Sequence, residues 1–311
     1  MSYSLQEINE KVRNCPSEFT AEGERMYEAR LKNAAERISA NISRSPIVLL
    51  AGPSGSGKTT TAQKLGEELL KLGIKTHAIS MDNYFSTLDP KTAPRDENGE
   101  IDLESPECVD RELLTEHFSE LARGNEIKVP QYIFAEQKRS DTLFTPVRLE
   151  ENEIAIFEGI HALNGSLTSG HREAFKLYIS TASDIVEGDT VIFEHSWFRL
   201  LRRLVRDTSF RGVTVNEDLA LWDNVVRGER KFIKPFIGNA DMTLDSSLIY
   251  EASVMKTAGY AICQGVTPGT ENFDVLMKIG EGISRVAELD EEYVPKTSML
   301  REFIGGGTYT Y

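Results

Sequence analysis

The sequence predicts an α/β fold in which a doubly wound, mostly parallel sheet carries helices on both faces. The first observation is a set of short apolar runs, rich in β-branched residues, at 47–51, 74–80, 154–157 and 175–179. Stretches with helical spacing lie between several of these runs, and strands that alternate with helices form parallel sheets with both faces covered. The second observation is a glycine-rich loop at 52–60, placed between the first run and a helical pattern.

The loop reads Gly-Pro-Ser-Gly-Ser-Gly-Lys-Thr-Thr and fits the pattern GxxxxGK[ST], so the expected fold is of the P-loop NTPase type. Glycines let the backbone curl until its N–H groups point at phosphate oxygens, and the helix N-terminus that follows favours negative charge. Lys58 can reach the outer phosphates of ATP, and the Thr59 hydroxyl can ligate Mg²⁺. The ATP-binding residues expected from the loop are Gly52, Ser54, Gly55, Ser56, Gly57, Lys58, Thr59 and Thr60.

The chain before the loop divides into two parts. Residues 1–19 are polar and show no pattern, whereas apolar residues at helical spacing predict a helix over 20–41. We therefore expect an N-terminal polar segment with a packing helix at 1–44. Residues 45–311 are expected to form the domain that carries the loop.

The elements after the second strand follow from local patterns. Prolines, a glycine and many charges make 86–109 a long surface loop, and Asp110 is a good N-cap for a helix that runs to about residue 123. The further expected elements are an extended stretch at 127–135, a helix at 217–232, a strand at 241–244, a C-terminal helical segment at about 270–311 and a last turn at 300–303.

Composition narrows the class of protein. The chain has 311 residues and a net charge of −14, which argues against a specific nucleic-acid binder. Its three cysteines are far apart and form no CxxC pair, so neither a disulfide framework nor a zinc site is indicated. We see no signal peptide and no run long enough to span a membrane, and we expect a cytoplasmic protein, with a homo-oligomer left open.

Two carboxylates follow predicted strands at the edge where ligands collect in parallel sheets. Asp82 comes after the strand at 74–80 and can accept a proton from an attacking hydroxyl or orient Mg²⁺; the plainer alternative is a turn or helix-cap aspartate. Glu158 ends the strand at 154–157 and can hold Mg²⁺ directly or through water, the alternative being a solvated strand end. The five histidines show no metal-binding spacing.

A predicted helix near residues 196–207 concentrates positive charge in this acidic chain. At 100° per residue, its arginines share one face and its leucines the other. With Arg211-Gly212 after it, this segment is an Arg-rich lid helix, in a lid at about 195–215, that closes over ATP and neutralises the transferring phosphoryl group. The alternative is a solvated basic face held by ion pairs. The arginines of the face are Arg199, Arg202, Arg203 and Arg206.

Taken together, these motifs resemble the uridine kinase and phosphoribulokinase family over about residues 45–260. Two further segments, 222–229 and 300–306, are similar to a bacterial branch of nucleoside kinases that often carries an N-terminal TGS-type domain. Only about 45 residues precede the core here, so we expect that domain to be absent. The motifs that carry the resemblance are the loop and the segments 80–85, 104–106, 129–132, 157–160 and 202–207.

The resemblance implies an ATP- and Mg²⁺-dependent kinase that phosphorylates the 5′-hydroxyl of a nucleoside. Asp82 corresponds to the carboxylate that activates this hydroxyl, with Lys58 and Arg206 as further catalytic residues. Thr59 and Glu158 correspond to the Mg²⁺ site, and Arg202 and Arg211 are expected at ATP. The expected nucleoside-binding residues are Tyr84, Phe85, Glu104, Tyr132, Gln137, Arg203 and Arg206.

The chain departs from the uridine kinase pattern at four positions. It has Leu103 where an aromatic residue is usual, Ile133 for Asp, Gln137 for His and Val213 for Arg. A site built for one hydrogen-bond pattern rejects the wrong partner strongly, so these departures imply a changed acceptor, with a pyrimidine nucleoside favoured. A kinase of the same fold acting on a sugar phosphate and a non-catalytic nucleotide-binding regulator stay as alternatives.

Overall fold

A five-stranded parallel sheet forms the centre of the molecule. The computed structural model describes residues 2–133 and 136–309, and within them the strand order is β10-β7-β2-β6-β3. Each neighbouring pair runs parallel, which confirms the predicted doubly wound fold. The strands of this sheet are β2 (Ile47–Ala51), β3 (Lys75–Ser80), β6 (Glu153–Gly159), β7 (Phe175–Ser180) and β10 (Met242–Asp245).

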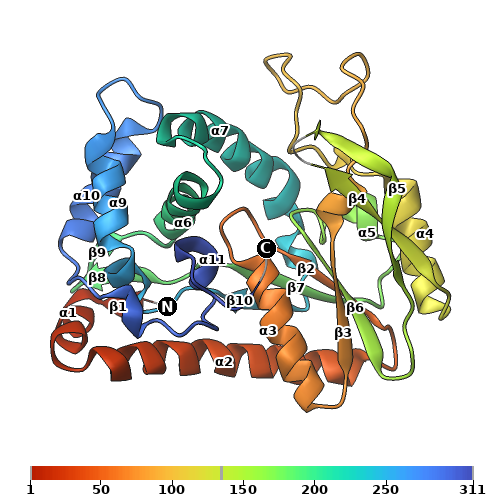
Figure 1. Cartoon of the computed structure of the whole chain (residues 1–311), viewed down its shortest axis with the longest axis horizontal. Helices are drawn as coiled ribbons and strands as arrows, with labels where there is room; N and C mark the ends of the chain where they lie inside the picture. The colour runs from red at the N-terminus through yellow and green to blue at the C-terminus, as the bar shows by residue number, and fades with distance from the viewer. Residues whose placement is uncertain (1, 134–135, 310–311) are drawn as a thin grey trace.

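Alternate residues of the inner strands β2, β6 and β7 enter two separate cores. In β2, Val48 and Leu50 join one cluster with the helices α2 and α3, whereas Ile47 and Leu49 join a second cluster with α4. This alternation follows from the period of two along a strand, and it covers both sheet faces with helices (Figure 1). The helices of these layers are α2 (Pro16–Asn41), α3 (Lys58–Lys71) and α4 (Arg111–Ala122).

The N-terminal region is structured throughout its described part, so the expectation of a patternless segment at 1–19 is wrong. It holds β1 (Ser2–Ser4), α1 (Leu5–Asn14) and the start of α2. β1 pairs in parallel with β8 (Asp184–Glu187), which also pairs with β9 (Thr190–Phe193). A three-residue strand has no periodicity of its own, and its partner lies about 180 residues away, so local patterns miss it.

Most of the other expected elements are present with shifted ends. The stretch expected at 127–135 is β4 (Ile127–Ile133), an antiparallel partner of β5 (Lys138–Val147), and residues 134–135 lie outside the described residues. The lid helix is α6 (His195–Phe210), and α7 (Val215–Gly228) continues into a π-helical turn at Glu229–Ile233. The remaining helices are α5 (Gly165–Thr168), α8 (Glu251–Val254), α9 (Lys256–Gly265), α10 (Phe273–Ser284) and α11 (Arg301–Ile304).

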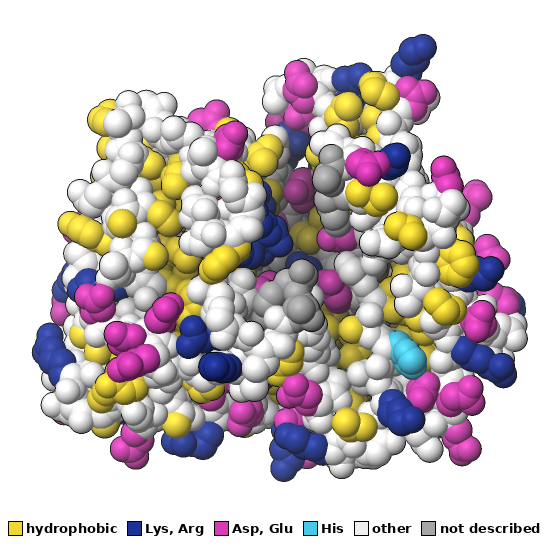
Figure 2. Space-filling model, viewed as in Figure 1, with side chains coloured by type: hydrophobic (Ala, Val, Ile, Leu, Met, Phe, Trp, Pro, Cys, Tyr) yellow, Lys and Arg dark blue, Asp and Glu magenta, His cyan; other side chains and the backbone are white. Residues whose placement is uncertain are grey.

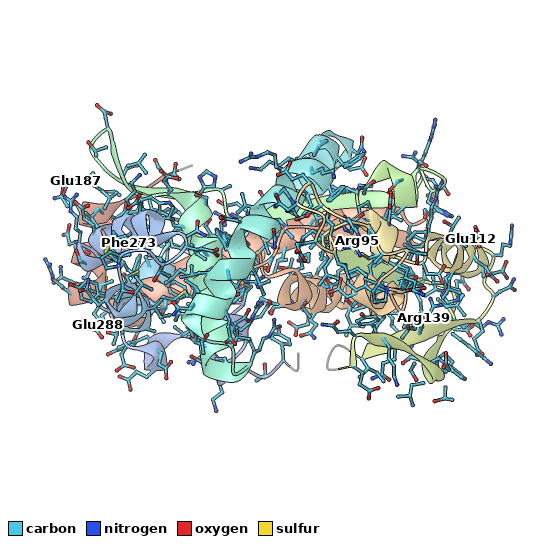
Figure 3. The ribbon with its side chains drawn as sticks, turned by 90° about the horizontal axis from the view of Figure 1, so that it is seen from above. Arg95, Glu112, Arg139, Glu187, Phe273 and Glu288 are labelled. Atoms are coloured by element: carbon cyan, nitrogen blue, oxygen red, sulfur yellow. The ribbon has the colours of Figure 1, made fainter. Side chains whose placement is uncertain are left out.

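Two groups of elements lie at opposite ends of the sheet. Figure 3 shows Phe273 of α10 at one end of the molecule and Arg139 of the β4–β5 hairpin at the other. None of the helices in the described part of the chain combines the length and the apolar character needed to cross a bilayer. The carboxyl ends of the central strands open between these two groups, which is where the candidate site lies.

Candidate active site

The phosphate loop joins β2 to α3 in a conformation that only glycine tolerates. Gly55 and Gly57 have φ of 76° and 81°, in the left-handed region. A Cβ on Gly55 would lie 2.6 Å from the Arg199 carbonyl oxygen, and one on Gly57 would lie 2.6 Å from Met299 Sδ. Gly57 caps α3 without a side-chain acceptor, so the loop offers its first-turn N–H groups to an anion.

A cavity of about 940 Å³ opens at this loop. Figure 2 shows the hollow, with Lys and Arg side chains gathered on one wall and Asp and Glu side chains facing them. Its lining combines the loop with two strand ends, the lid helix and the C-terminal segment. The lining includes Ser54, Lys58, Thr59, Asp82, Phe85, Leu103, Glu104, Glu158, Ile160, Arg203, Arg206, Phe210, Arg211, Arg301, Glu302, Gly305, Gly306, Gly307 and Tyr309.

Three of the predicted loop residues are buried and do not line the cavity in this structure. Gly52 is buried where a Cβ would lie 2.4 Å from the Ile179 carbonyl oxygen. Ser56 is fully buried, and its hydroxyl has no hydrogen-bond partner among the described residues. Thr60 is also buried, and both its N–H and its hydroxyl donate to Glu302. The cavity therefore meets the loop through Ser54, Gly55 and the residues from Gly57 to Thr59.

The two carboxylates predicted at strand ends come together beside Lys58. Glu158 is paired in register with Leu50 and Ser80, and Asp82 follows Ser80 in a 3-10 turn. Burial raises the pKa of Asp82, while the charge of Lys58 opposes the rise. Burial likewise raises the pKa of Glu158, to about 7, and Lys58 again opposes the rise. The two partly desolvated carboxylates share one neighbouring lysine, so the positive charge around them does not match their negative charge.

This donor set fits Mg²⁺. The Thr59 hydroxyl and the Glu158 carboxylate are hard oxygen ligands on the cavity wall, and the carboxylate is buried, with the charge of Lys58 favouring its ionised form. Within the described residues no group of three or more Asp, Glu, His or Cys side chains surrounds one point. Such a sparse set suits Mg²⁺, which keeps several waters and completes its shell with phosphate oxygens.

The lid arginines divide into a group of three that lines the cavity and a pair that lies inside the protein. Arg203 and Arg206 line the cavity, and they are held by Asp218 at 2.5 Å and Asp207 at 2.6 Å. Arg203 also donates to the Ser54 hydroxyl at 3.3 Å. Arg211 ends the lid with its side chain 55% exposed and 3.4 Å from Asp207. These three guanidinium groups form the positive wall opposite the carboxylates.

The pair supports the loop from inside the protein. Arg202 is 0% exposed and forms a fork with Glu251, at 2.5 and 2.7 Å. It donates further to the Gly55 carbonyl oxygen at 3.2 Å, and Arg199 donates to the Ser54 carbonyl oxygen at 3.0 Å. Because a buried guanidinium needs a carboxylate, Arg202 packs inward and does not line the cavity, so in this structure it does not reach the position expected for an ATP ligand.

One part of the cavity wall is apolar and acidic, and we refer to it as the acceptor end after the residues expected there. Phe85, Leu103 and Ile160 line it together with Glu104. Burial raises the pKa of Glu104 to about 7, against the opposing charge of Arg203. The basic side chains among the described lining residues are Lys58, the lid arginines and Arg301 of the C-terminal segment. None of them comes from the segments that carry Phe85, Leu103, Glu104 and Ile160, so this end suits an uncharged ligand.

Three predicted acceptor residues lie elsewhere. Tyr84 is fully buried and its hydroxyl hydrogen-bonds to His117 at 2.8 Å, so it is a core residue and not a cavity residue. Tyr132 lies behind Phe85, with ring centroids 5.6 Å apart. Gln137 is exposed at the turn between β4 and β5, with φ of 51°. Tyr132 and Gln137 do not line the cavity in this form of the chain.

The sequence did not identify the C-terminal side of the cavity. Arg301, Glu302 and the glycines at 305–307 line it, together with Phe210 of the lid helix. The glycine triplet at 305–307 was the sequence signal that could have indicated this segment. Gly305 and Gly306 have φ of 79° and 70°, a conformation that favours glycine. A Cβ on Gly305 would lie 2.5 Å from the Phe210 ring, so the triplet allows the segment to pass close to the lid.

Comparison with known proteins gives consistent results. Residues 47–248 match the family model described as "Phosphoribulokinase / Uridine kinase family". A uridine kinase of Macrococcus caseolyticus is 30% identical over 204 residues, which cover 65% of this chain and 89% of the relative. A uridine kinase of Staphylococcus aureus is 31% identical over 199 residues, covering 64% and 86%. A solved structure, a possible uridine kinase from Bacillus stearothermophilus, is 18% identical with a TM-score of 0.45, covering 70% of this chain and 98% of that one.

Proposed function

Because the chain belongs to the phosphoribulokinase and uridine kinase family, we propose that it transfers the terminal phosphoryl group of ATP to the 5′-hydroxyl of a nucleoside. The observation that supports this most strongly is the position of Asp82. Its carboxylate lines the same cavity as the phosphate loop and lies within electrostatic reach of Lys58. A base beside the terminal phosphate is what an attacking hydroxyl requires.

The proposed reaction is an in-line displacement at the terminal phosphorus. The N–H groups of the loop and Lys58 hold the triphosphate. Asp82 accepts the proton of the nucleoside 5′-hydroxyl while the oxygen of that hydroxyl bonds to the terminal phosphorus. The bond to the bridging oxygen breaks, and ADP leaves. Thr59 and Glu158 would hold Mg²⁺, which when bound supplies positive charge to the phosphate oxygens. Arg203, Arg206 and Arg211 add positive charge on the cavity wall, where they would stabilise the charge of the transferred group.

The acceptor end favours a nucleoside over a sugar phosphate. A phosphorylated acceptor brings a second anion, which would meet Glu104 and the apolar side chains of Phe85 and Leu103. A planar base can pack on such side chains, and Glu104 can take part in hydrogen bonds to it or to the ribose. We assign a pyrimidine nucleoside as the acceptor class.

The identity of the base depends on groups that differ from the uridine kinase pattern. Leu103 lines the cavity and is 58% exposed, so it offers apolar contact where an aromatic ring would stack. Gln137 is exposed at a turn outside the lining. Discrimination between uracil and other bases therefore relies on different contacts from those of the pattern.

An acceptor panel tests the proposal. Purified protein is incubated with Mg²⁺-ATP and one of uridine, cytidine, thymidine, deoxyuridine, adenosine, guanosine or a pentose phosphate, and the products are identified by mass spectrometry. We expect a pyrimidine nucleoside 5′-monophosphate, and Asp82→Asn serves as the control for background ATP hydrolysis. Phosphorylation of the pentose phosphate alone would replace the proposal by the sugar-phosphate alternative. ATP binding without turnover of any acceptor would favour a nucleotide-binding regulator.

A further inference from the structure

The C-terminal strap, residues 296–309, crosses the start of α3 and lies outside the family match. Lys64 of α3 donates to the Thr297 carbonyl oxygen at 3.0 Å, and the Tyr309 hydroxyl donates to Glu67 at 2.7 Å. Met299 packs against Gly57 of the phosphate loop. These contacts hold the strap directly on the loop and on the helix that follows it.

Within the strap, Glu302 binds two donors of Thr60, the last residue of the predicted phosphate loop. Its Oε2 atom accepts from the Thr60 hydroxyl at 2.6 Å and from the Thr60 N–H at 3.3 Å. Thr60 is the third residue of α3, so its N–H belongs to the helix end that a phosphate loop directs at the phosphates of its nucleotide. The carboxylate therefore occupies a position where a phosphate group of ATP is expected.

Two anions cannot share these donors. A phosphate oxygen at the Thr60 N–H would meet the Glu302 carboxylate at hydrogen-bonding distance, with like charges in a partly buried site. We propose that Glu302 is an internal competitor of the donor nucleotide, and that ATP binds only after the C-terminal strap has moved this carboxylate away. The inference rests on the proposed function, because it requires the loop to bind a nucleotide.

The lid offers a place for the displaced carboxylate. Burial lowers the pKa of Arg211 of the lid, and the charge of Glu302 is among those that oppose this fall, so the two side chains lie within electrostatic reach of each other. The strap also contacts the lid helix, since Phe210 packs on Gly305 and the Arg206 guanidinium lies 5.9 Å from the Phe303 ring centroid. If the Glu302 carboxylate moved from Thr60 to the lid, nucleotide binding would be coupled to a movement of the C-terminal strap and of the lid helix.

The size of the effect follows from the competition. When only a fraction of the protein is free of the internal contact, the apparent dissociation constant for nucleotide rises by the inverse of that fraction. A charge-assisted hydrogen bond of this kind shifts an equilibrium by roughly one to two factors of ten. Removing the Glu302 charge should therefore tighten nucleotide binding by about tenfold or more.

The test is calorimetric titration of the full chain with Mg²⁺ and a non-hydrolysable ATP analogue. Glu302→Ala and Glu302→Gln are expected to bind at least about tenfold more tightly than the unaltered protein. Glu292→Gln is the matched control, because it removes an exposed carboxylate just before the strap and should leave the affinity unchanged. Equal or weaker binding by both Glu302 variants would overturn the inference while leaving the proposed function intact.

A second measurement needs no variant. Hydrogen exchange of residues 296–309 in the unaltered protein should become faster when the analogue binds, because the strap loses its contact with Thr60. Unchanged or slower exchange on saturation would reject the displacement. Failure of every protein to bind the analogue would instead overturn the proposed function, and the inference with it.

Discussion

Replacing Arg202 by Met should lower the stability of the whole protein and have a smaller effect on nucleotide binding. The guanidinium is 0% exposed, its fork to Glu251 spans 2.5 and 2.7 Å, and it donates to the carbonyl oxygens of Gly55 and Ser246. Its loss leaves the Glu251 carboxylate buried and unpaired. Breaking a buried pair in this way costs about 3–5 kcal/mol.

This cost translates into a measurable fall in Tm. Unfolding entropies of about 2.1 cal/mol/K per residue give about 0.65 kcal/mol/K for 311 residues. The variant Arg202→Met should therefore unfold about 5–8 °C lower in a calorimetric or fluorescence melt. Arg211→Met is the matched control, since its side chain is 55% exposed and its loss should lower activity with little change in Tm.

A double variant distinguishes the loss of the Arg202–Glu251 ion pair from the loss of side-chain packing at these positions. Replacing both Arg202 and Glu251 by Met removes the unpaired charge and should restore much of the lost stability. The reasoning fails if Arg202→Met melts with the unaltered protein and instead raises KM for ATP several-fold. That result would place Arg202 on the nucleotide, where the helical pattern alone puts it.

Three further substitutions test the site. Asp82→Asn removes the proton acceptor, so turnover should fall at least about 10²-fold while ATP binding persists in calorimetry; undiminished turnover would exclude Asp82 as the base. Lys58→Ala should abolish detectable turnover, and normal activity would contradict the loop assignment. Burial raises the pKa of Glu104 from 4.5 to about 7. The contribution of Glu104 to stability is therefore present below pH 4.5 and is lost as the pH rises through 7. The loss of stability is at most about 3 kcal/mol. Glu104→Gln should therefore raise Tm at pH 8 and barely change it at pH 5, and equal shifts at both would refute the buried charge.

Local patterns were sufficient for the framework. A β-branched run before the glycine loop and a helical pattern after it predicted β2 and α3, and both lie where expected. Helical spacing places the leucines of the lid helix opposite its arginines, and Leu200, Leu201 and Leu204 are buried in the core. Such predictions succeed because strand and helix periods are properties of the backbone and are written in adjacent residues.

Periodicity did not decide which arginines of that helix face the cavity. A helical face about 100° wide contains Arg199, Arg202, Arg203 and Arg206 alike. Arg202 turns inward because Glu251 lies opposite it in space, 49 residues away in the chain. Tyr84 shows the same effect, since its hydrogen bond to His117 draws it into the core and away from its expected role at the acceptor.

By itself, the sequence determined the phosphate loop, the positions of the central strands along the chain and the side of the lid helix that carries charge, because each depends on neighbouring residues. Only the tertiary structure decided that Glu302 meets Thr60, a contact between residues 242 positions apart. It also decided which carboxylates share Lys58 and which arginines reach the cavity. These outcomes depend on packing between distant segments, where desolvation forces each buried charge to find a partner that no local pattern names.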